Sequence, residues 1–245
     1  MRWVYLSPHF DDAVLSCGGL MYEQAQQGQA VEIWTICAGS PPPAPLSPLA
    51  QRIHLLWRTG SAEETVHLRR EEDRQAAARL GANILHGPLP DCIYRRAPNG
   101  EALYTQGVFV PWSPLERNLP AQIAAWLSEH LTPEDVLVSP LAIGGHVDHL
   151  LVRLAAERLE RALRYYADVP YVLKAAAVLQ SITTGLASTL HPVSENGMQA
   201  WAEAVAAYRS QLFMLFKTEG RMKSALRRYA RQHGGLRLWY SQSAA

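Results

Sequence analysis

The sequence predicts an α/β fold with a mostly parallel central sheet and helices on both faces. A short apolar run, Trp3 to Leu6, is typical of a strand that is covered on both sides. A helical pattern from Ala13 to Gln27 ends at Gly28, and Ala30 to Cys37 is a second strand rich in Val and Ile. This strand–helix–strand opening favours a parallel sheet with crossover helices.

The remaining elements continue the alternation of strands and helices. Ser61 and Glu64 form a capping box that opens a helix through Leu80, and Gly81 ends that helix. Further strands are expected at 83–86, 135–139, 165–168 and 236–240, and further helices at 119–131, 149–163, 200–213 and 220–232. With 245 residues, 48% of them hydrophobic, and no clear boundary, we expect one domain over residues 1–245.

Two long segments are expected to be irregular. The proline-rich stretch in residues 39–60 lacks many of the amide donors that regular structure needs. Residues 87–117 are rich in Pro, Tyr, Trp and Arg. Long loops inside compact domains often act as lids or binding loops, so both are expected near the edge of an active site.

Composition excludes several classes of protein. A net charge of +1 gives no reason to expect a nucleic-acid partner. Cys17, Cys37 and Cys92 lack CxxC spacing, which argues against a disulfide framework and favours the reducing cytoplasm. The N-terminus does not resemble a signal peptide. The most apolar later stretch, 171–190, contains Lys174 and many polar groups, so no membrane span is expected.

Two polar clusters fall where predicted strands end. Residues 9–12 read His-Phe-Asp-Asp after the first strand, and residues 146–149 read His-Val-Asp-His after the fourth. In open parallel sheets, ligands bind in the crevice outside the carboxyl ends of the strands. The clusters would face each other there if their strands are neighbours.

The residue types in these clusters suit a catalytic zinc, which usually has three protein ligands and one open position. His9 and Asp12 are three residues apart, so one turn can aim both at one point, and His149 can complete the set. Asp11 and His146 would then lie beside the metal. A free carboxylate next to a metal-bound water is what a general base requires.

Other interpretations stay open at this stage. Either acid of the Asp11–Asp12 pair, or Asp148, can serve only as a helix cap. Such carboxylate and histidine sets also occur in two-metal phosphoesterases, and an inactive metal-binding protein is a further alternative. A Ser-His-Asp esterase is disfavoured because no GxSxG motif occurs.

Three motifs resemble the LmbE-like, PIG-L-type family of N-acetylglucosaminyl deacetylases. They are PHFDDAVLSCGG at 8–19, RREEDRQAAARLGA at 69–82 and HVDH at 146–149. Phe10 and Val147 stand where the family usually has proline. The loop before His146, LAIGG, lacks the acidic or polar residues that many members carry, which leaves the substrate open.

The resemblance implies a Rossmann-like three-layer fold and zinc-dependent hydrolysis of an N-acyl amide on an amino sugar. It implies zinc on His9, Asp12 and His149, with Asp11 as general base and protonated His146 steadying the oxyanion.

Three further residues are candidates around the centre that the resemblance implies. Asp148 is expected either to hold a histidine in its working tautomer or to cap its helix. Arg69 is expected to form an ion pair with Glu72 or to reach the substrate, and Asp91 to bind a sugar hydroxyl or to serve as a turn residue. The implied partner is a small N-acetylated amino-sugar conjugate, and the chain is expected to be capable of forming a homo-oligomer.

Overall fold

The computed structural model describes residues 1–242 and contains one seven-stranded sheet in the order β3-β2-β1-β4-β5-β7-β6. The first five of these strands run parallel, and β7 joins β5 and β6 in antiparallel pairs. The strands are β1 Arg2–Ser7, β2 Ala30–Thr35, β3 Asn83–His86, β4 Val136–Pro140, β5 Leu163–Tyr166, β6 Ala187–His191 and β7 Leu236–Tyr240. The prediction of a mostly parallel sheet is confirmed.

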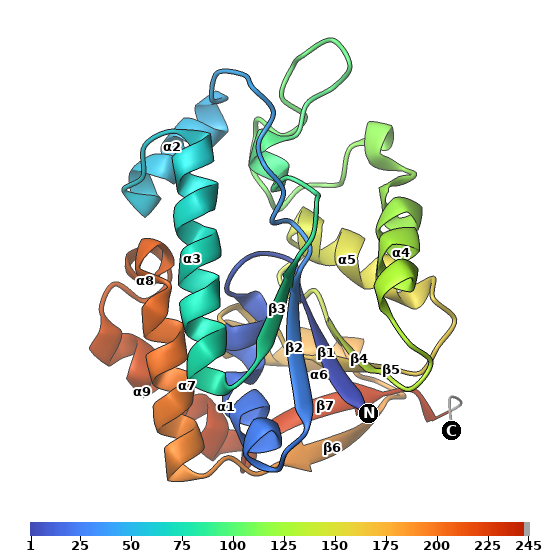
Figure 1. Cartoon of the computed structure of the whole chain (residues 1–245), viewed down its shortest axis with the longest axis vertical. Helices are drawn as coiled ribbons and strands as arrows, with labels where there is room; N and C mark the ends of the chain where they lie inside the picture. Colours follow the sequence, from blue (N-terminus) through green and yellow to red (C-terminus); the bar gives the residue numbers. More distant parts are fainter. Residues whose placement is uncertain (243–245) are drawn as a thin grey trace.

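Helices cover both faces of this sheet. Figure 1 shows α1, α3 and α7 together on one side, with α4 and α5 on the other. The helices are α1 Asp12–Gln26, α2 Pro48–Trp57, α3 Ala62–Leu80, α4 Leu119–His130, α5 Val147–Glu157, α6 Ala176–Ile182, α7 Glu195–Ala207, α8 Arg209–Phe216 and α9 Glu219–His233. No helix within residues 1–242 is long and apolar enough to cross a membrane.

The order in which strands are added to the sheet reverses between β1 and β4. Strands β2 and β3 follow β1 on one side, whereas β4 and β5 extend the sheet on the other. Val4 pairs with Leu137 in the parallel register, so both strands end at the same edge. A crevice opens at such a switch point because the two following loops diverge from each other.

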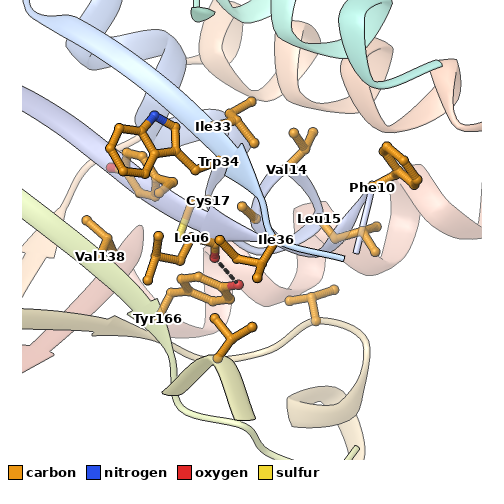
Figure 2. Packing of buried hydrophobic residues seen from close by; sticks show 14 of the residues in the cluster. Leu6, Phe10, Val14, Leu15, Cys17, Ile33, Trp34, Ile36, Val138 and Tyr166 are labelled. Carbon is orange, nitrogen blue, oxygen red and sulfur yellow. Dashed lines mark hydrogen bonds between the residues drawn. The ribbon is translucent and has the colours of Figure 1, made fainter. Parts of the chain in front are cut away.

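The core lies on both faces of β1 and its neighbours. Leu6 and Ile33 are fully buried, and Figure 2 shows them among side chains from the first helix and from β4 and β5. The hydroxyl of Tyr166 donates to the backbone oxygen of Leu6 over 2.9 Å, which satisfies a buried phenol. This packing fixes the strand ends from which the polar clusters project.

The paired glycines of the first motif allow a close helix contact. A Cβ added at Gly18 would lie 2.5 Å from Cδ1 of Trp201, and one at Gly19 would lie 2.8 Å from Val193 Cγ1. The Trp201 indole donates to the Val14 oxygen over 2.7 Å. Because the first helix has no side chains at these positions, α7 can pack directly on its backbone.

The sequence predicted that the segment 39–60 would be irregular. The structure differs, because this segment contains α2. Ser47 accepts from the amide of Ala50, and Pro48 is the first helical residue. Proline is well suited to that position, since the amide it lacks has no intrahelical partner there. The run of prolines predicts an irregular segment throughout, whereas Pro48 begins a helix.

Other element boundaries also differ from the prediction. The expected helix 200–213 is two helices, α7 and α8, that divide at Tyr208. The fifth helix begins at Val147 rather than at His149, with His146 as its N-cap. The short α6 and β6 were not predicted. Strand β6 is half exposed at the sheet edge, so it lacks the apolar run of a buried strand.

Candidate active site

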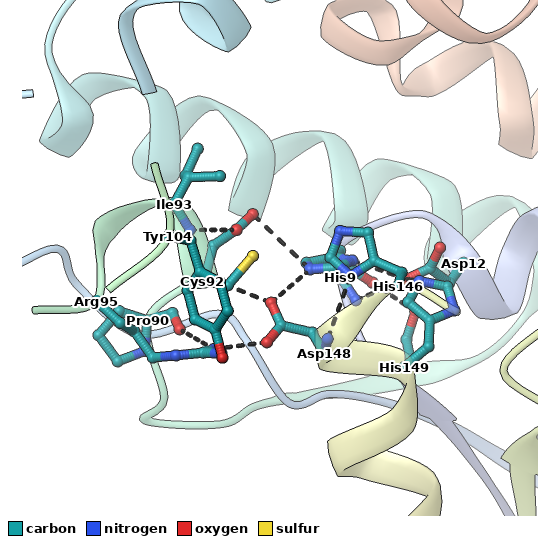
Figure 3. Close-up of polar contacts among 12 residues, drawn as sticks. His9, Asp12, Pro90, Cys92, Ile93, Arg95, Tyr104, His146, Asp148 and His149 are labelled. Carbon is teal, nitrogen blue, oxygen red and sulfur yellow. Dashed lines mark hydrogen bonds and ion pairs between the residues drawn. The ribbon is translucent and has the colours of Figure 1, made fainter. Parts of the chain in front are cut away.

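The two polar clusters meet at the edge where β1 and β4 end. Residues 8–11 connect β1 to its helix, and residues 141–146 connect β4 to α5. Figure 3 shows His9, Asp12, His146 and His149 gathered at this edge. The rings of His9 and His146 are 4.7 Å apart, and those of His146 and His149 are 5.1 Å apart.

The carboxylate of Asp12 lies close to a ring nitrogen of His9 and to a ring nitrogen of His149. The carboxylate atom Oδ2 of Asp12 lies 3.2 Å from Nδ1 of His9 and 3.2 Å from Nε2 of His149. Ligands that share a tetrahedral zinc at ordinary bond lengths are separated by about 3.3 Å. The buried Nε2 of His149 has no well-oriented hydrogen-bond partner among the described residues. The ring nitrogens of His9, His146 and His149 also lie within 4.8 Å of one another, so these histidines and Asp12 together offer the donor types and the spacing that a zinc ion requires.

A buried carboxylate orients each of the two histidines, His9 and His149, that are candidate metal ligands. Nε2 of His9 lies 3.0 Å from Oδ2 of Asp148, and Nδ1 of His149 lies 2.7 Å from Oδ1 of Asp168. Each carboxylate accepts a hydrogen bond from the ring N–H that faces it, so in the neutral ring the opposite nitrogen keeps a lone pair for a metal. Carboxylate–histidine pairs of this kind are the usual second layer of a zinc site.

The electrostatics of the donor set favour a cation. Burial by itself would raise the pKa of Asp12, but His149 and His9 outweigh burial and hold it well below its usual range. Burial by itself would lower the pKa of His149, whereas Asp12 and Asp168 raise it to about 9. Without a metal, a proton on His149 balances the negative charge of the buried carboxylates. A divalent cation would therefore bind by replacing protons.

Asp148 does not cap its helix, because the N-cap of α5 is His146. Its Oδ2 also accepts from the amide of Cys92 over 3.0 Å, and its Oδ1 lies 2.6 Å from Arg95. Arg95 in turn contacts Glu116 over 2.5 Å. Burial opposes ionisation of Asp148, but Arg95 and His9 hold its pKa well below the usual value. The carboxylate therefore stays charged and ties the segment 91–95 to the metal side of the site.

Asp11 lies beside the donor set and is free to act on a proton. Burial, followed by the charge of Asp12, raises the pKa of Asp11 to about 7. Its nearest cation is Arg69, at 3.8 Å, which is too long for a hydrogen bond. A carboxyl group that titrates near neutral pH can both take up and release a proton during one reaction.

His146 is held in a defined tautomer. Its Nδ1 accepts a hydrogen bond from the amide of Asp148 over 3.2 Å, which leaves the proton of the neutral ring on Nε2. Burial, together with the charges of His9 and His149, holds the pKa of His146 well below 6.5. This environment favours a neutral ring that donates from Nε2, in place of the protonated ring that the sequence predicted.

Arg69 points into the site and does not pair with Glu72. Its guanidinium lies over the ring of Trp57 at 4.5 Å and the ring of Phe10 at 5.2 Å. Its Nε is buried without a hydrogen-bond partner. Glu72 instead accepts from the hydroxyl of Ser210 over 2.6 Å. The arginine therefore keeps donors available to a ligand.

Asp91 serves as a turn residue, one of the two roles that the sequence suggested. Its Oδ1 accepts from the amide of Ile93 and caps a short 3₁₀ helix, Cys92–Tyr94. Its Oδ2 lies 3.7 Å from Arg69 and 3.9 Å from His9. One oxygen holds the turn, and the other faces the catalytic cavity.

A cavity of about 330 Å³ is lined by His9, Asp11, Asp12, Arg69, Asp91 and His146. The two long segments both contribute to it, with Ile53 and Trp57 from one and Val108 and Phe109 from the other. Tyr171 also lines it. Few polar groups on a largely apolar wall are typical of sites for small molecules.

The structure adds residues that the sequence reasoning missed. Asp168 was predicted only as the end of a strand, and Arg95 was not singled out. A hint existed for Asp168, because it follows a strand at the same sheet edge as the two polar clusters. Nothing in the local sequence pairs Asp168 with His149, which is nineteen residues away.

Known proteins resemble this chain in sequence and in structure. A 2′-N-acetylparomamine deacetylase of Niallia circulans is 28% identical over 90% of this chain and 84% of its own length. A crystal structure of the zinc-inhibited form of teicoplanin deacetylase matches with a TM-score of 0.84 and 31% identity. The match covers 98% of this chain and 97% of the teicoplanin deacetylase chain.

A more distant structure shares the fold alone. The N,N′-diacetylchitobiose deacetylase of Pyrococcus horikoshii has a TM-score of 0.60 at 15% identity, over 97% of this chain and 83% of the other.

The sequence profile of the PIG-L family, described as GlcNAc-PI de-N-acetylase, matches residues 4–159 and so includes every residue of the two polar clusters. The chain therefore belongs to the PIG-L family, as its motifs predicted.

Proposed function

We propose that this protein is a zinc-dependent N-deacetylase that converts an N-acetylated amino-sugar small molecule and water into a free amine and acetate. The observation that carries the proposal is the position of Asp12, whose Oδ2 lies 3.2 Å from a ring nitrogen of His9 and 3.2 Å from one of His149, with Asp11 beside this cluster. Relatives that cover nearly the whole chain are deacetylases, which supports this reaction over phosphate-ester cleavage.

His9, Asp12 and His149 would hold the zinc. When bound, zinc lowers the pKa of water and polarises the amide carbonyl. Asp11 takes the proton from the attacking water. Nε2–H of His146 donates to the oxygen that becomes negative in the tetrahedral species. Asp11 then returns its proton to the departing nitrogen, so water has supplied hydroxyl to the acyl group and a proton to the amine.

Arg69 and Asp91 would orient the sugar. The buried Nε of Arg69 has no hydrogen-bond partner, and Asp91 presents a carboxylate oxygen to the same cavity. A donor and an acceptor side by side match a sugar hydroxyl, which both donates and accepts. Trp57 and Tyr171 line the same space and offer faces for the ring of the sugar.

Three broader statements belong to the same proposal. We place the catalytic unit in one domain over residues 1–245, because a single sheet includes strands from both ends of the chain. We assign the fold to the Rossmann-like class on the order of its parallel strands. We place the enzyme in the cytoplasm, since Cys17, Cys37 and Cys92 are free thiols.

The test combines metal content with acetate release. Purified protein is expected to bind about one zinc per chain and to release acetate from a panel of N-acetylglucosaminides. Asp11→Asn should keep the zinc and lower kcat by about 10²- to 10⁴-fold, as is typical when an acid–base group is lost. Asp135→Asn is the matched control, because Asp135 lies at the opposite end of β4.

Two outcomes would contradict the proposal. A protein that binds no zinc under metal-replete conditions would remove the mechanism. An Asp11→Asn variant with full activity and full zinc content would remove Asp11 from its role as base.

A further inference from the structure

A second cavity adjoins the catalytic one. It measures about 1040 Å³ and shares Pro170, Tyr171 and Leu215 with the catalytic cavity as common wall. Its other walls come from the segment 173–175, from the end of α8 and from the exposed face of α9. A molecule whose sugar occupies the first cavity would extend into the second by passing Tyr171.

The second cavity is lined by cations without acids. Lys174 enters from one side, and Arg221 and Arg228 enter from α9 on the other. The two arginines are seven residues apart and share one helical face with Ser224, which also lines the cavity. No acidic residue is among the residues that line this cavity within the described part of the chain.

Two cations of α9 that lie outside this cavity are paired with acids. Lys223 lies 2.6 Å from Glu219, and Arg227 lies 3.6 Å from Glu195, so both are neutralised by a neighbouring acid. Within residues 1–242, no ion pair is formed by the three cations that face the cavity. Three unneutralised positive charges around one concave space create a local positive potential that attracts anions.

We propose that this second cavity is a subsite for an anionic substituent of the substrate, a carboxylate or a phosphate, held by Lys174, Arg221 and Arg228. The inference rests on the proposed deacetylase function and adds a substrate class to it: an N-acetylated amino sugar whose aglycone carries a negative charge. The shared wall connects the two sites, and the charge of the second cavity selects the substituent.

The test compares glycosides that differ only in the end of the aglycone. The probes are the pentyl, 4-carboxybutyl and 4-phosphobutyl glycosides of N-acetylglucosamine. For the wild type at low salt, kcat/KM for the two anionic glycosides should exceed that for the pentyl glycoside by about fivefold, the effect of roughly one exposed ion pair. Added salt should reduce this preference, because exposed charges are screened.

Two double variants locate the effect. R221Q/R228Q should lose the preference and keep its activity on the pentyl glycoside. K223Q/R227Q removes the same charge from the same helix outside the cavity and should keep the preference. The phosphate glycoside exceeding the carboxylate glycoside would identify a phosphate as the natural substituent, and the reverse order a carboxylate.

The inference and the proposed function fail separately. Equal turnover of all three glycosides by the wild type, or a preference that survives in R221Q/R228Q, would overturn the subsite and leave the deacetylase intact. If no glycoside is turned over, calorimetric binding of the 4-phosphobutyl glycoside to the zinc-loaded protein decides the subsite. Equal affinity of the wild type and R221Q/R228Q would then overturn it.

Discussion

Replacing Asp168 with asparagine should weaken zinc binding although Asp168 is not expected to touch the metal. Its Oδ1 accepts from Nδ1 of His149 over 2.7 Å, and its Oδ2 accepts from the amide of Ile143 over 3.0 Å. Both partners are donors, so a carboxylate satisfies both, but an asparagine has only one acceptor oxygen. Either orientation of the asparagine amide disrupts the site, because its one oxygen can accept from only one of the two donors.

If the amide oxygen faces Ile143, its NH₂ group faces Nδ1 of His149. The imidazole then has to carry its proton on Nε2, the nitrogen expected to bind zinc. If the oxygen faces His149, the NH₂ group opposes the buried N–H of Ile143 and leaves both donors unsatisfied. Loss of such an outer carboxylate lowers metal affinity by about 10- to 100-fold, or about 1.4–2.8 kcal/mol.

The affinity is measured by competition with a chromophoric zinc chelator at constant pH, on protein whose fold is checked by thermal unfolding. Asp73→Asn is the matched control. Asp73 is a fully buried carboxylate that contacts His86 over 2.9 Å and accepts from Tyr208, away from the metal ligands. That variant should lose stability and keep its zinc affinity. A folded Asp168→Asn protein with wild-type zinc affinity would refute the reasoning.

Three further predictions concern charge and packing. Asp11 must be deprotonated to act as base, and Arg69 lowers the pKa of Asp11. Arg69→Met should therefore move the acid limb of the pH profile of kcat/KM from near pH 7 to higher pH. An acid limb that does not move would exclude this coupling. Burial by itself would raise the pKa of Asp135, but a 2.6 Å contact with Arg2 outweighs burial and lowers this pKa. The Asp135 carboxylate therefore stabilises the fold above its ordinary pKa of about 4. This stabilisation is lost as the pH falls through the lower pKa of the folded state. Asp135→Asn should therefore cost about 1–3 kcal/mol at pH 7 in urea unfolding, with a difference that shrinks toward pH 3, and a cost independent of pH would contradict the ion pair. Gly18→Ala should lower the unfolding free energy by about 1–3 kcal/mol, because the new methyl group would lie 2.5 Å from an indole carbon of α7; an unchanged melting temperature would show that α7 moves freely.

Local sequence patterns determined the elements that surround the site. The apolar run 3–6, the helix that Ser61 opens and Gly81 ends, and the strand 135–139 correspond to β1, α3 and β4. These elements are predictable because burial periodicity and caps act between residues close in the chain. The same locality explains why the metal-ligand residue types were visible as two short motifs.

Only the tertiary structure decided which distant groups meet. The pairing of β1 with β4 brings His9 close to His149, and the end of β5 brings Asp168 to His149. The hydrogen bond from the amide of Asp148 places the proton of His146 on Nε2. These are contacts between elements whose order in the sheet no single segment encodes.

The same limit explains what the sequence left out. Nothing near Arg95 in the chain shows that it neutralises Asp148, and nothing near Lys174 shows that it faces α9 across a cavity. A charge is identical in sequence whether it is paired or free, because pairing depends on the positions of all its neighbours in space. The sequence by itself therefore indicated the residue types of the proposed catalytic centre, and the fold decided the orientation, protonation and surroundings of these groups.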